Sequence, residues 1–227
     1  ASAIVNYVKG GNSRDLVDTV LDILENYPPQ AVKLLMNHIG THDTARILTV
    51  LGKENGQTGD RAWQSAQKLS DEEYSRGVRL LKLAAVLQFT LPGVPSVYYG
   101  DEAGMQGYGD PFCRAGYPWG KENTELLDFY KKLGTFRRSS PVFASGEFEP
   151  IYANFGDIVY IRRKGKNAVL VAVNRWHEPS EVTVLDEFKA AKPIFGNKPT
   201  DGKISLPAES FAMLEIQLRQ SKKLKNE

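Results

Sequence analysis

The sequence has few of the residues that disulfide frameworks and zinc centres require. Its 227 residues include one cysteine, Cys113, and three histidines, without the Cys/His spacing of a zinc site. Apolar runs are too short to cross a bilayer, residues 1–10 do not have the pattern of a signal peptide, and a net charge of +2 is too small to indicate nucleic acid or an anionic membrane. We therefore expect a globular protein without a metal site. A cytoplasmic enzyme and a disulfide-free exported enzyme both fit, and we favour the cytoplasm.

Two short apolar runs end on polar side chains. Residues 94–99 stop at Gly100, Asp101 and Glu102, and residues 31–37 lead into a loop that contains His42 and Asp43. Continuous apolar runs predict strands that are buried on both faces, as in a parallel sheet. Since active sites of α/β barrels lie at the carboxyl ends of their strands, the two loops predict a ligand site.

Helical patterns surround these runs. Residues 13–26 have apolar positions at helical spacing and end before Pro28 and Pro29. Ser70 and Glu73 form a capping box for a helix that continues to about Leu87, and residues 123–138 predict another helix. The long segment 103–120 is expected to be a functional loop. Residues 53–59 also predict a loop, and the basic end at 222–225 is interpreted as a solvated terminus.

The periodicity changes from helix to strand after Pro141. Short apolar runs separated by turn residues lie at 146–150, 158–162, 168–174, 181–184 and 211–216. Residues 164–167 are a hairpin signal. Regular short strands of this kind predict a small antiparallel β-sandwich.

The two strand ends resemble a known family. Val97 to Glu102 is similar to the region after the last barrel strand of alpha-amylase-type glycoside hydrolases, especially the neopullulanase and cyclomaltodextrinase group. The following loop adds further matching residues, namely Gly104-Met105, Asp110-Pro111, Cys113-Arg114 and Trp119. Met36 to Thr49 resembles the family's block at the end of the seventh strand. Thr41 stands where the family often has asparagine, and some neopullulanase-like members have a small hydroxyl residue there.

The resemblance implies the last repeats of a TIM (β/α)8 barrel over residues 1–142, followed by a C-terminal antiparallel β-sandwich domain over 143–227. The fold class expected is thus α/β plus all-β. No segment before Ala31 resembles the family blocks that contain the nucleophilic aspartate and the acid/base glutamate. We therefore expect a fragment that begins near the sixth repeat and is inactive alone.

The resemblance also implies roles for individual residues. Asp43 would be the third catalytic carboxylate, which binds sugar hydroxyls and supports the oxocarbenium-like state. The implied substrate-binding residues are His42, Arg46, Asp110 and Arg114. Retaining glycosidases need two other carboxyl groups about 5–5.5 Å apart.

Each of these residues also has a structural interpretation. Asp43 could cap a helix that begins at Thr44, and His42 could pack in its loop. Arg46 could orient Asp43 or a neighbouring carboxylate, or form a surface ion pair. Asp101 and Glu102 do not form an obvious catalytic dyad, because adjacent strand residues point to opposite faces; at least one of them could fix the following loop.

Aromatic residues are the remaining candidates. Tyr108 and Trp119 could stack on glucose rings or pack in the interior. For Tyr98 and Tyr99 we favour the core. Trp176 follows the run at 168–174 in a turn, where packing is the simplest expectation for it and for His177.

The expected function is that of a retaining hydrolase fragment whose parent acts on α-glucans or maltooligosaccharides, at α-1,4, α-1,6 or cyclic linkages. No organic cofactor is implied. Calcium occurs in parts of the family, but no calcium-loop pattern is present. The alternatives are a non-catalytic scaffolding protein with an amylase-like fold and a carbohydrate-binding β-domain.

Self-association is a further expectation. A complete barrel closes its sheet and has no edge, whereas the runs from Ala31 and Val94 would expose apolar edges that recruit another chain. The simplest product is a two-fold homodimer.

Overall fold

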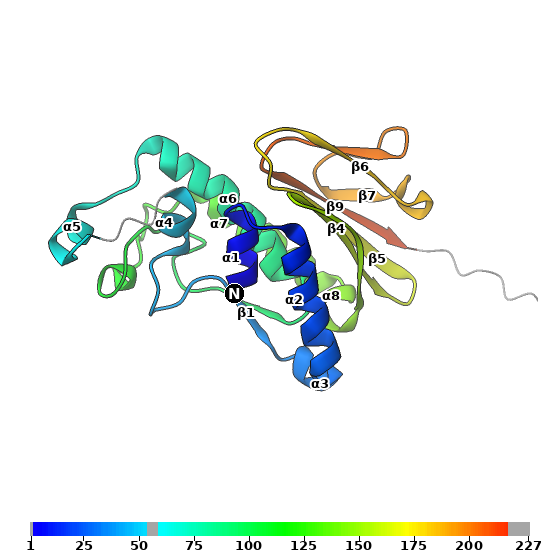
Figure 1. Ribbon diagram of the computed structural model, residues 1–227, viewed down its shortest axis with the longest axis horizontal. Coiled ribbons are helices and arrows are strands. Elements are labelled where there is room, and N and C mark those ends of the chain that lie inside the picture. The colour runs from blue at the N-terminus through cyan, green and yellow to red at the C-terminus, as the bar shows by residue number, and fades with distance from the viewer. Residues whose placement is uncertain (1, 54–58, 218–227) are drawn as a thin grey trace, which may run out of the picture.

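The computed structural model describes residues 2–53 and 59–217. Helices dominate the chain up to Ser145, and antiparallel sheets follow (Figure 1). The helices are α1 (Ser2–Val8), α2 (Ser13–Asn26), α3 (Pro29–Val32), α4 (Ile47–Gly52), α5 (Arg61–Ala66), α6 (Asp71–Thr90), α7 (Thr124–Ser139) and α8 (Val142–Ser145), with a 3-10 turn η1 (Phe112–Arg114). The predicted loop at 53–59 and the basic end at 222–225 lie largely or wholly outside the described residues.

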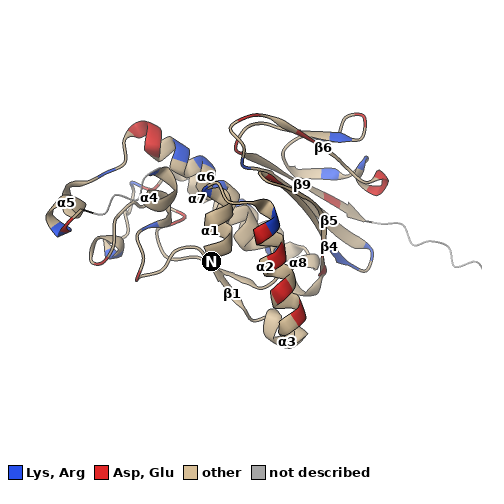
Figure 2. Ribbon diagram, viewed as in Figure 1, with Lys and Arg blue, Asp and Glu red and all other residues tan. Residues whose placement is uncertain are grey.

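The long helices begin and pack as their sequences predict. The Asn12 side chain accepts a hydrogen bond from the Arg14 amide at the start of α2, and Ser70 with Glu73 forms the expected capping box of α6. Buried residues of α2 alternate with an exposed acidic row, visible along α2 in Figure 2. Helix α6 extends to Thr90, and every residue of its last two turns, from Leu83 to Thr90, is buried because packing surrounds it.

Two short parallel strands carry the site loops. Strand β1 (Met36–His38) pairs with β2 (Val94–Ser96), with Met36 opposite Val94. The prediction of a strand from Ala31 is wrong, because Pro29 at the first turn starts the short helix α3 instead. Burial on both faces is also not observed: Met36 is 68% exposed and Val94 is 44% exposed, since the described sheet has only these two strands.

The region after Ser145 contains a five-stranded antiparallel sheet with strand order β3-β4-β5-β9-β7 and a two-stranded sheet of β6 and β8. The strands are β3 (Glu147–Asn154), β4 (Asp157–Lys164), β5 (Asn167–Asn174), β6 (Ser180–Thr183), β7 (Lys192–Phe195), β8 (Lys203–Leu206) and β9 (Ser210–Gln217), with a 3-10 turn η2 (Asp186–Phe188). The hairpin at 164–167 is confirmed.

Alternate residues of β4 and β5 enter two different cores. Ile158, Tyr160 and Val169 belong to the cluster that contains the α6 side chains. Val159 and Leu170 belong to a second cluster with side chains of β6 and β8. The five-stranded sheet is therefore covered on both faces, by helices and by the smaller sheet, as a period of two residues requires.

The sheet fixes the end of α6, which leads into β2. The buried Arg162 of β4 donates to the Thr90 carbonyl at 2.6 Å and to the Gly146 carbonyl at 2.9 Å. Its guanidinium thereby satisfies a carbonyl at the C-terminal end of the helix, where a cation is also favourable for the helix dipole. The position of β2 thus depends on packing between the helical part and the sheet.

Candidate functional site

Asp43 lies in the loop between β1 and α4. The loop is closed by hydrogen bonds of its threonines: the Thr41 amide donates to Thr44 Oγ1 and the Asp43 amide to Thr41 Oγ1, both at 3.3 Å. The Asp43 side chain is 68% exposed. Helix α4 begins only at Ile47, with Arg46 at its N-cap. Asp43 is therefore not a helix cap, and that structural interpretation is wrong.

Four predicted site residues meet around this carboxylate. His42 Nε2 lies 3.1 Å from Asp43 Oδ2, and Arg114 Nη2 lies 3.4 Å from Asp43 Oδ1. Arg114 also reaches Asp110 Oδ1 through Nε, at 2.9 Å, and the same Nε donates to the His42 carbonyl at 3.1 Å. We call His42, Asp43, Asp110 and Arg114 the Asp43 cluster. It places carboxylates, a guanidinium and an imidazole on an exposed surface, a set that can hydrogen-bond sugar hydroxyls.

The long loop 103–120 provides half of this cluster. Its 3-10 turn η1 contains Cys113, which is buried and donates its thiol to the His42 carbonyl at 3.2 Å. The His42 carbonyl therefore accepts from two residues of the loop, Cys113 and Arg114. Sequence reasoning gave Cys113 no role, and only tertiary contact identifies its function in joining the two loops.

Arg46 lies away from this surface, although it is close to Asp43 in sequence. Its side chain is fully buried, 3.5 Å from Asp101 Oδ1 through Nη1. The guanidinium packs on the rings of Tyr98 and Tyr99, with 4.3 and 4.5 Å from Cζ to the ring centroids, and donates to the Tyr99 carbonyl. Two structural interpretations were predicted for Arg46. The surface ion pair is wrong, because the Arg46 side chain is buried, and its partner is a neighbouring carboxylate, that of Asp101. Direct contact between Arg46 and substrate stays a prediction.

Asp101 is the acidic partner in this buried pair. Burial raises the pKa of the Asp101 carboxyl to about 7, and Glu102 adds to this, while Arg46 acts in the opposite direction. A Cβ atom at Gly40 would lie 2.4 Å from Asp101 Oδ2. Asp101 therefore fills the space beneath the loop that carries Asp43, and the tight approach requires glycine at position 40.

The Glu102 carboxylate has a different partner from the Asp101 carboxylate. Its Oε2 accepts a hydrogen bond from the Gly100 amide at 2.8 Å, and Gly100 has a positive φ of 87°. Glu102 thus closes the sharp turn after β2. The two acids do not face one reacting bond, which agrees with the expected structural role of at least one of them.

The aromatic candidates differ in exposure. Trp119 is 81% exposed and its ring lies 4.5 Å from that of Tyr117. Tyr108 is buried against Trp63. Tyr99, which we expected in the core, is partly exposed, and its hydroxyl donates to the Ala115 carbonyl at 2.8 Å. Trp119 and Tyr99 are therefore available for contact with a ligand, whereas Tyr108 is not.

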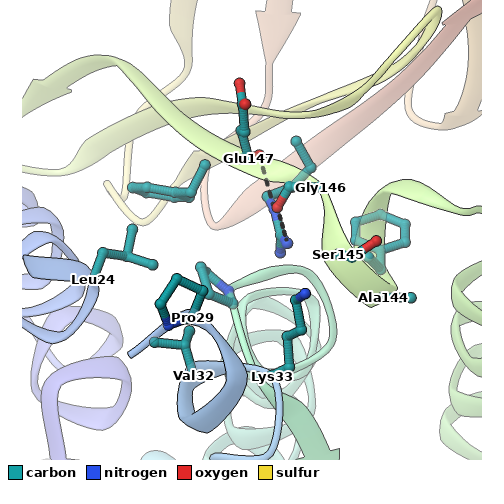
Figure 3. Close-up of a pocket in the computed structure, with 13 residues that line it drawn as sticks. Leu24, Pro29, Val32, Lys33, Ala144, Ser145, Gly146 and Glu147 are labelled. Carbon is teal, nitrogen blue, oxygen red and sulfur yellow. Dashed lines mark hydrogen bonds between the residues drawn. The ribbon is translucent and has the colours of Figure 1, made fainter. Parts of the chain in front are cut away.

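Metal clusters and membrane-spanning helices are absent from the described part of the chain. Within residues 2–53 and 59–217, no group of three or more His, Cys, Asp or Glu side chains could hold a metal ion, and no helix is long and apolar enough to cross a membrane. A hollow of about 160 Å³ lies between α3 and α8, near Gly93 at the start of β2 (Figure 3). It is largely apolar, the Glu147 carboxylate points away from it, and it shares no residue with the Asp43 cluster.

Known proteins are similar to this chain over much of its length. Residues 11–123 match the family model for the alpha-amylase catalytic domain. An amylopullulanase from Thermoanaerobacter thermohydrosulfuricus is 42% identical over 145 residues, which cover 64% of this chain and 9% of that protein. A cyclomaltodextrinase from Geobacillus thermopakistaniensis is 31% identical over 175 residues, covering 75% of this chain and 26% of that protein.

Solved structures show the same fold. An Anoxybacillus alpha-amylase has a TM-score of 0.75 at 23% identity, covering 96% of this chain and 46% of that one. A cyclic α-maltosyl-(1→6)-maltose hydrolase from Arthrobacter globiformis, in complex with its cyclic sugar, has a TM-score of 0.73 at 25% identity, covering 94% of this chain and 42% of that one.

The fold thus matches part of the fold of alpha-amylase-family barrel enzymes, and the antiparallel sheets are consistent with a C-terminal β-domain. The chain belongs to the alpha-amylase family. It spans less than half of the length of the relatives named above, from 9% to 46%.

Proposed function

We propose that this chain is the C-terminal part of a retaining glycoside hydrolase that acts on α-glucans. The observation that carries the proposal is the exposed Asp43 carboxylate, fixed by His42 and Arg114 in the loop after β1. Relatives named as an amylopullulanase and a cyclomaltodextrinase support α-glucans as the substrate class. Residues 1–142 would form the last barrel repeats, and residues 143–227 the β-sandwich domain.

In this proposal Asp43 accepts hydrogen bonds from sugar hydroxyls and binds most strongly when the ring is distorted. Arg114 holds one oxygen of Asp43 and also reaches Asp110, so the two carboxylates have a fixed relative position. His42 holds the other oxygen. Such preorganisation favours the transition state, because no reorganisation is needed when charge develops on the sugar.

The proposal assigns neither the nucleophile nor the acid/base to this chain. Retention requires two carboxyl groups about 5–5.5 Å apart on either side of the bond, whereas Asp101 is buried against Arg46. We therefore expect the 227-residue chain to release no reducing sugar from starch, pullulan or cyclodextrins. Release above a buffer control that survives repurification and is lost in Asp43→Asn would contradict this expectation.

The reaction class is tested in the longer protein that the proposal requires. Proton NMR of maltoheptaose hydrolysis reports the anomer of the first product formed. Retention predicts the α-anomer before mutarotation, because the reaction passes through a glycosyl-enzyme intermediate. Initial formation of the β-anomer, or absence of hydrolysis of every α-glucan tried, would refute the proposed function.

We also propose that the isolated chain forms a two-fold dimer through its β1–β2 sheet. Leu34 is 77% exposed beside this sheet, and Met36 and Val94 on paired strands are also exposed. Burial of such an apolar edge favours association. Light scattering over a range of concentrations should show a dimer that Met36→Lys weakens. A monomer at high concentration would contradict the proposal.

A further inference from the structure

A groove of about 540 Å³ lies far along the chain from the Asp43 cluster, where β5 leads into β6. This volume is within the range of small-molecule sites, roughly 300–1,000 Å³. The groove is lined by Asp157, Trp176, His177, Glu178, Pro179 and Ser180. Its lining therefore combines one indole with carboxylates, a hydroxyl and an imidazole, and shares no residue with the Asp43 cluster.

Trp176 is a partly exposed aromatic surface in this groove. Its exposed fraction is 41%, which differs from the packed position that the sequence favours for it. The Arg175 guanidinium lies over the ring, 4.9 Å from Cζ to the centroid. A Cβ atom at Gly156 would come within 2.2 Å of Trp176 Nε1. The indole thus packs against Gly156 and Arg175, while 41% of the Trp176 surface stays exposed.

The loop that carries Trp176 is held by the buried Asn174 side chain. Asn174 Oδ1 accepts from the Trp176 amide at 2.7 Å, and its Nδ2 donates to the Glu178 carbonyl at 2.9 Å. The Trp176 carbonyl in turn accepts from the Glu209 amide at 2.9 Å. Because both sides of the loop are fixed, a ligand would lose little affinity to ordering of the groove.

His177 fixes the loop to the helical part of the chain. Its Nδ1 lies 3.1 Å from Glu209 Oε1, and Glu209 Oε2 accepts from Arg79 of α6 at 2.9 Å. His177 is therefore committed to a structural contact on one side of its ring. The polar groups that remain for a ligand are His177 Nε2, the carboxylates of Asp157 and Glu178 and the Ser180 hydroxyl.

Asp157 and Ser180 are already aligned. Ser180 Oγ donates to Asp157 Oδ1 at 2.9 Å, which leaves the hydroxyl oxygen and the second carboxylate oxygen as acceptors for a ligand. The Glu178 side chain is exposed at the rim. Acceptors beside an aromatic surface match a pyranose ring, which offers an apolar face of C–H groups and hydroxyl donors at its edge.

We propose that this Trp176 groove is a second, non-catalytic sugar-binding site, which takes one or two glucose units of an α-glucan chain by stacking on the indole. The choice of α-glucans rests on the proposed function. The site would keep a polymeric substrate close to the enzyme, since two contacts on one chain raise the effective concentration of that chain at the other site.

The test uses the indole N–H signals of the three tryptophans in the 15N-labelled 227-residue chain, assigned with single Trp→Phe variants. Maltoheptaose should shift the Trp176 signal saturably, and cellohexaose should shift it far less.

Glu178→Ala removes an exposed acceptor and leaves the indole as reporter. This change should raise the Kd measured at the Trp176 signal about fivefold, as expected for the loss of one hydrogen bond. Glu181→Ala on β6 removes an exposed carboxylate outside the groove and is the matched control, with a Kd within about twofold of the parent.

Three results would overturn the proposal. The Trp176 signal could stay unchanged up to the solubility limit of maltoheptaose, it could respond equally to cellohexaose, or Glu178→Ala and Glu181→Ala could have the same effect. Trp119→Phe should leave the Kd at Trp176 unchanged, because Trp119 lies in the loop 103–120 and does not line the groove. The product-anomer experiment reports on catalysis and does not depend on Trp176, so failure of the proposed function and failure of this site are read separately.

Discussion

Two carboxylate–guanidinium pairs join the loop after β1 to the segment after β2, and their surroundings are opposite. Asp43 and Arg114 are largely exposed, with side-chain exposures of 68% and 46%. Asp101 and Arg46 have exposures of 2% and 0%. Exposed pairs contribute about 0–1 kcal/mol to stability, whereas removal of one partner of a buried pair costs about 3–5 kcal/mol. In the proposed function the exposed pair serves ligand binding, whereas the buried pair holds the two loops in place.

The largest effect is expected from Arg46→Met. This change leaves Asp101 buried without its cation and removes the donor to the Tyr99 carbonyl. The free energy of unfolding in urea should fall by about 3–5 kcal/mol. Arg114→Met is the matched control and should cost no more than about 1 kcal/mol. Equal losses in the two variants would mean that burial does not distinguish the pairs.

The pH dependence of stability sharpens the same comparison. The pKa of Asp101 is raised to about 7 by burial, while in the unfolded chain an aspartate titrates near about 3.9. The folded state therefore binds the Asp101 proton more tightly than the unfolded chain does. The contribution of protonated Asp101 to the free energy of unfolding is fully present below about pH 4, and it is lost as the pH rises through about 7. Urea unfolding from pH 4 to 8 should show a decline in stability that is smaller in Asp101→Asn. Parallel curves for the two proteins would refute the assignment.

Gly40→Ala should have an intermediate effect. The added Cβ would meet Asp101 Oδ2 at 2.4 Å, and overpacking at buried sites costs about 1–3 kcal/mol. Gly116→Ala is the control, because a Cβ there has no heavy atom within 4 Å. Thermal unfolding should separate the two variants by several degrees. If Gly40→Ala were as stable as Gly116→Ala, the carboxylate beneath the loop would be free to move.

The smallest effect on stability is expected from Asp43→Asn. Its contacts with His42 and Arg114 are exposed, so the free energy of unfolding should change by less than about 1 kcal/mol. A loss comparable to that of Arg46→Met would show that Asp43 has mainly a structural role.

Local patterns in the sequence predicted the regular elements well. The spacing of apolar residues and the Asn12 and Ser70 caps identified α2 and α6, and short apolar runs between turn residues identified β4 and β5. Strand β7 was missed because it contains Pro193, which is tolerated only since β7 is an edge strand of its sheet. Residues from Ala31 were predicted as a strand because apolar composition alone does not distinguish a strand from a short helix.

The candidate site could be predicted only in part. The His42-Asp43 and Asp110-Arg114 motifs located the exposed cluster by resemblance, and the structure brings these residues together. The sequence indicated a carboxylate partner for Arg46 but did not identify Asp101 as that partner. The contact joins loops that are far apart in the chain, since Arg46 and Tyr99 are separated by 53 residues. The exposure of Trp176 was not predicted either, since a turn residue can pack or face solvent with the same local sequence.

The most direct test of the account measures turnover and stability on the same variant. In the longer protein that the proposed function requires, kcat/KM for maltoheptaose and the urea unfolding midpoint are compared for the parent and Asp43→Asn. The account predicts that kcat falls by orders of magnitude while the midpoint is unchanged, because Asp43 acts on the distorted sugar and contributes little to folding. A near-normal kcat/KM, or a loss of activity explained by unfolding, would contradict it.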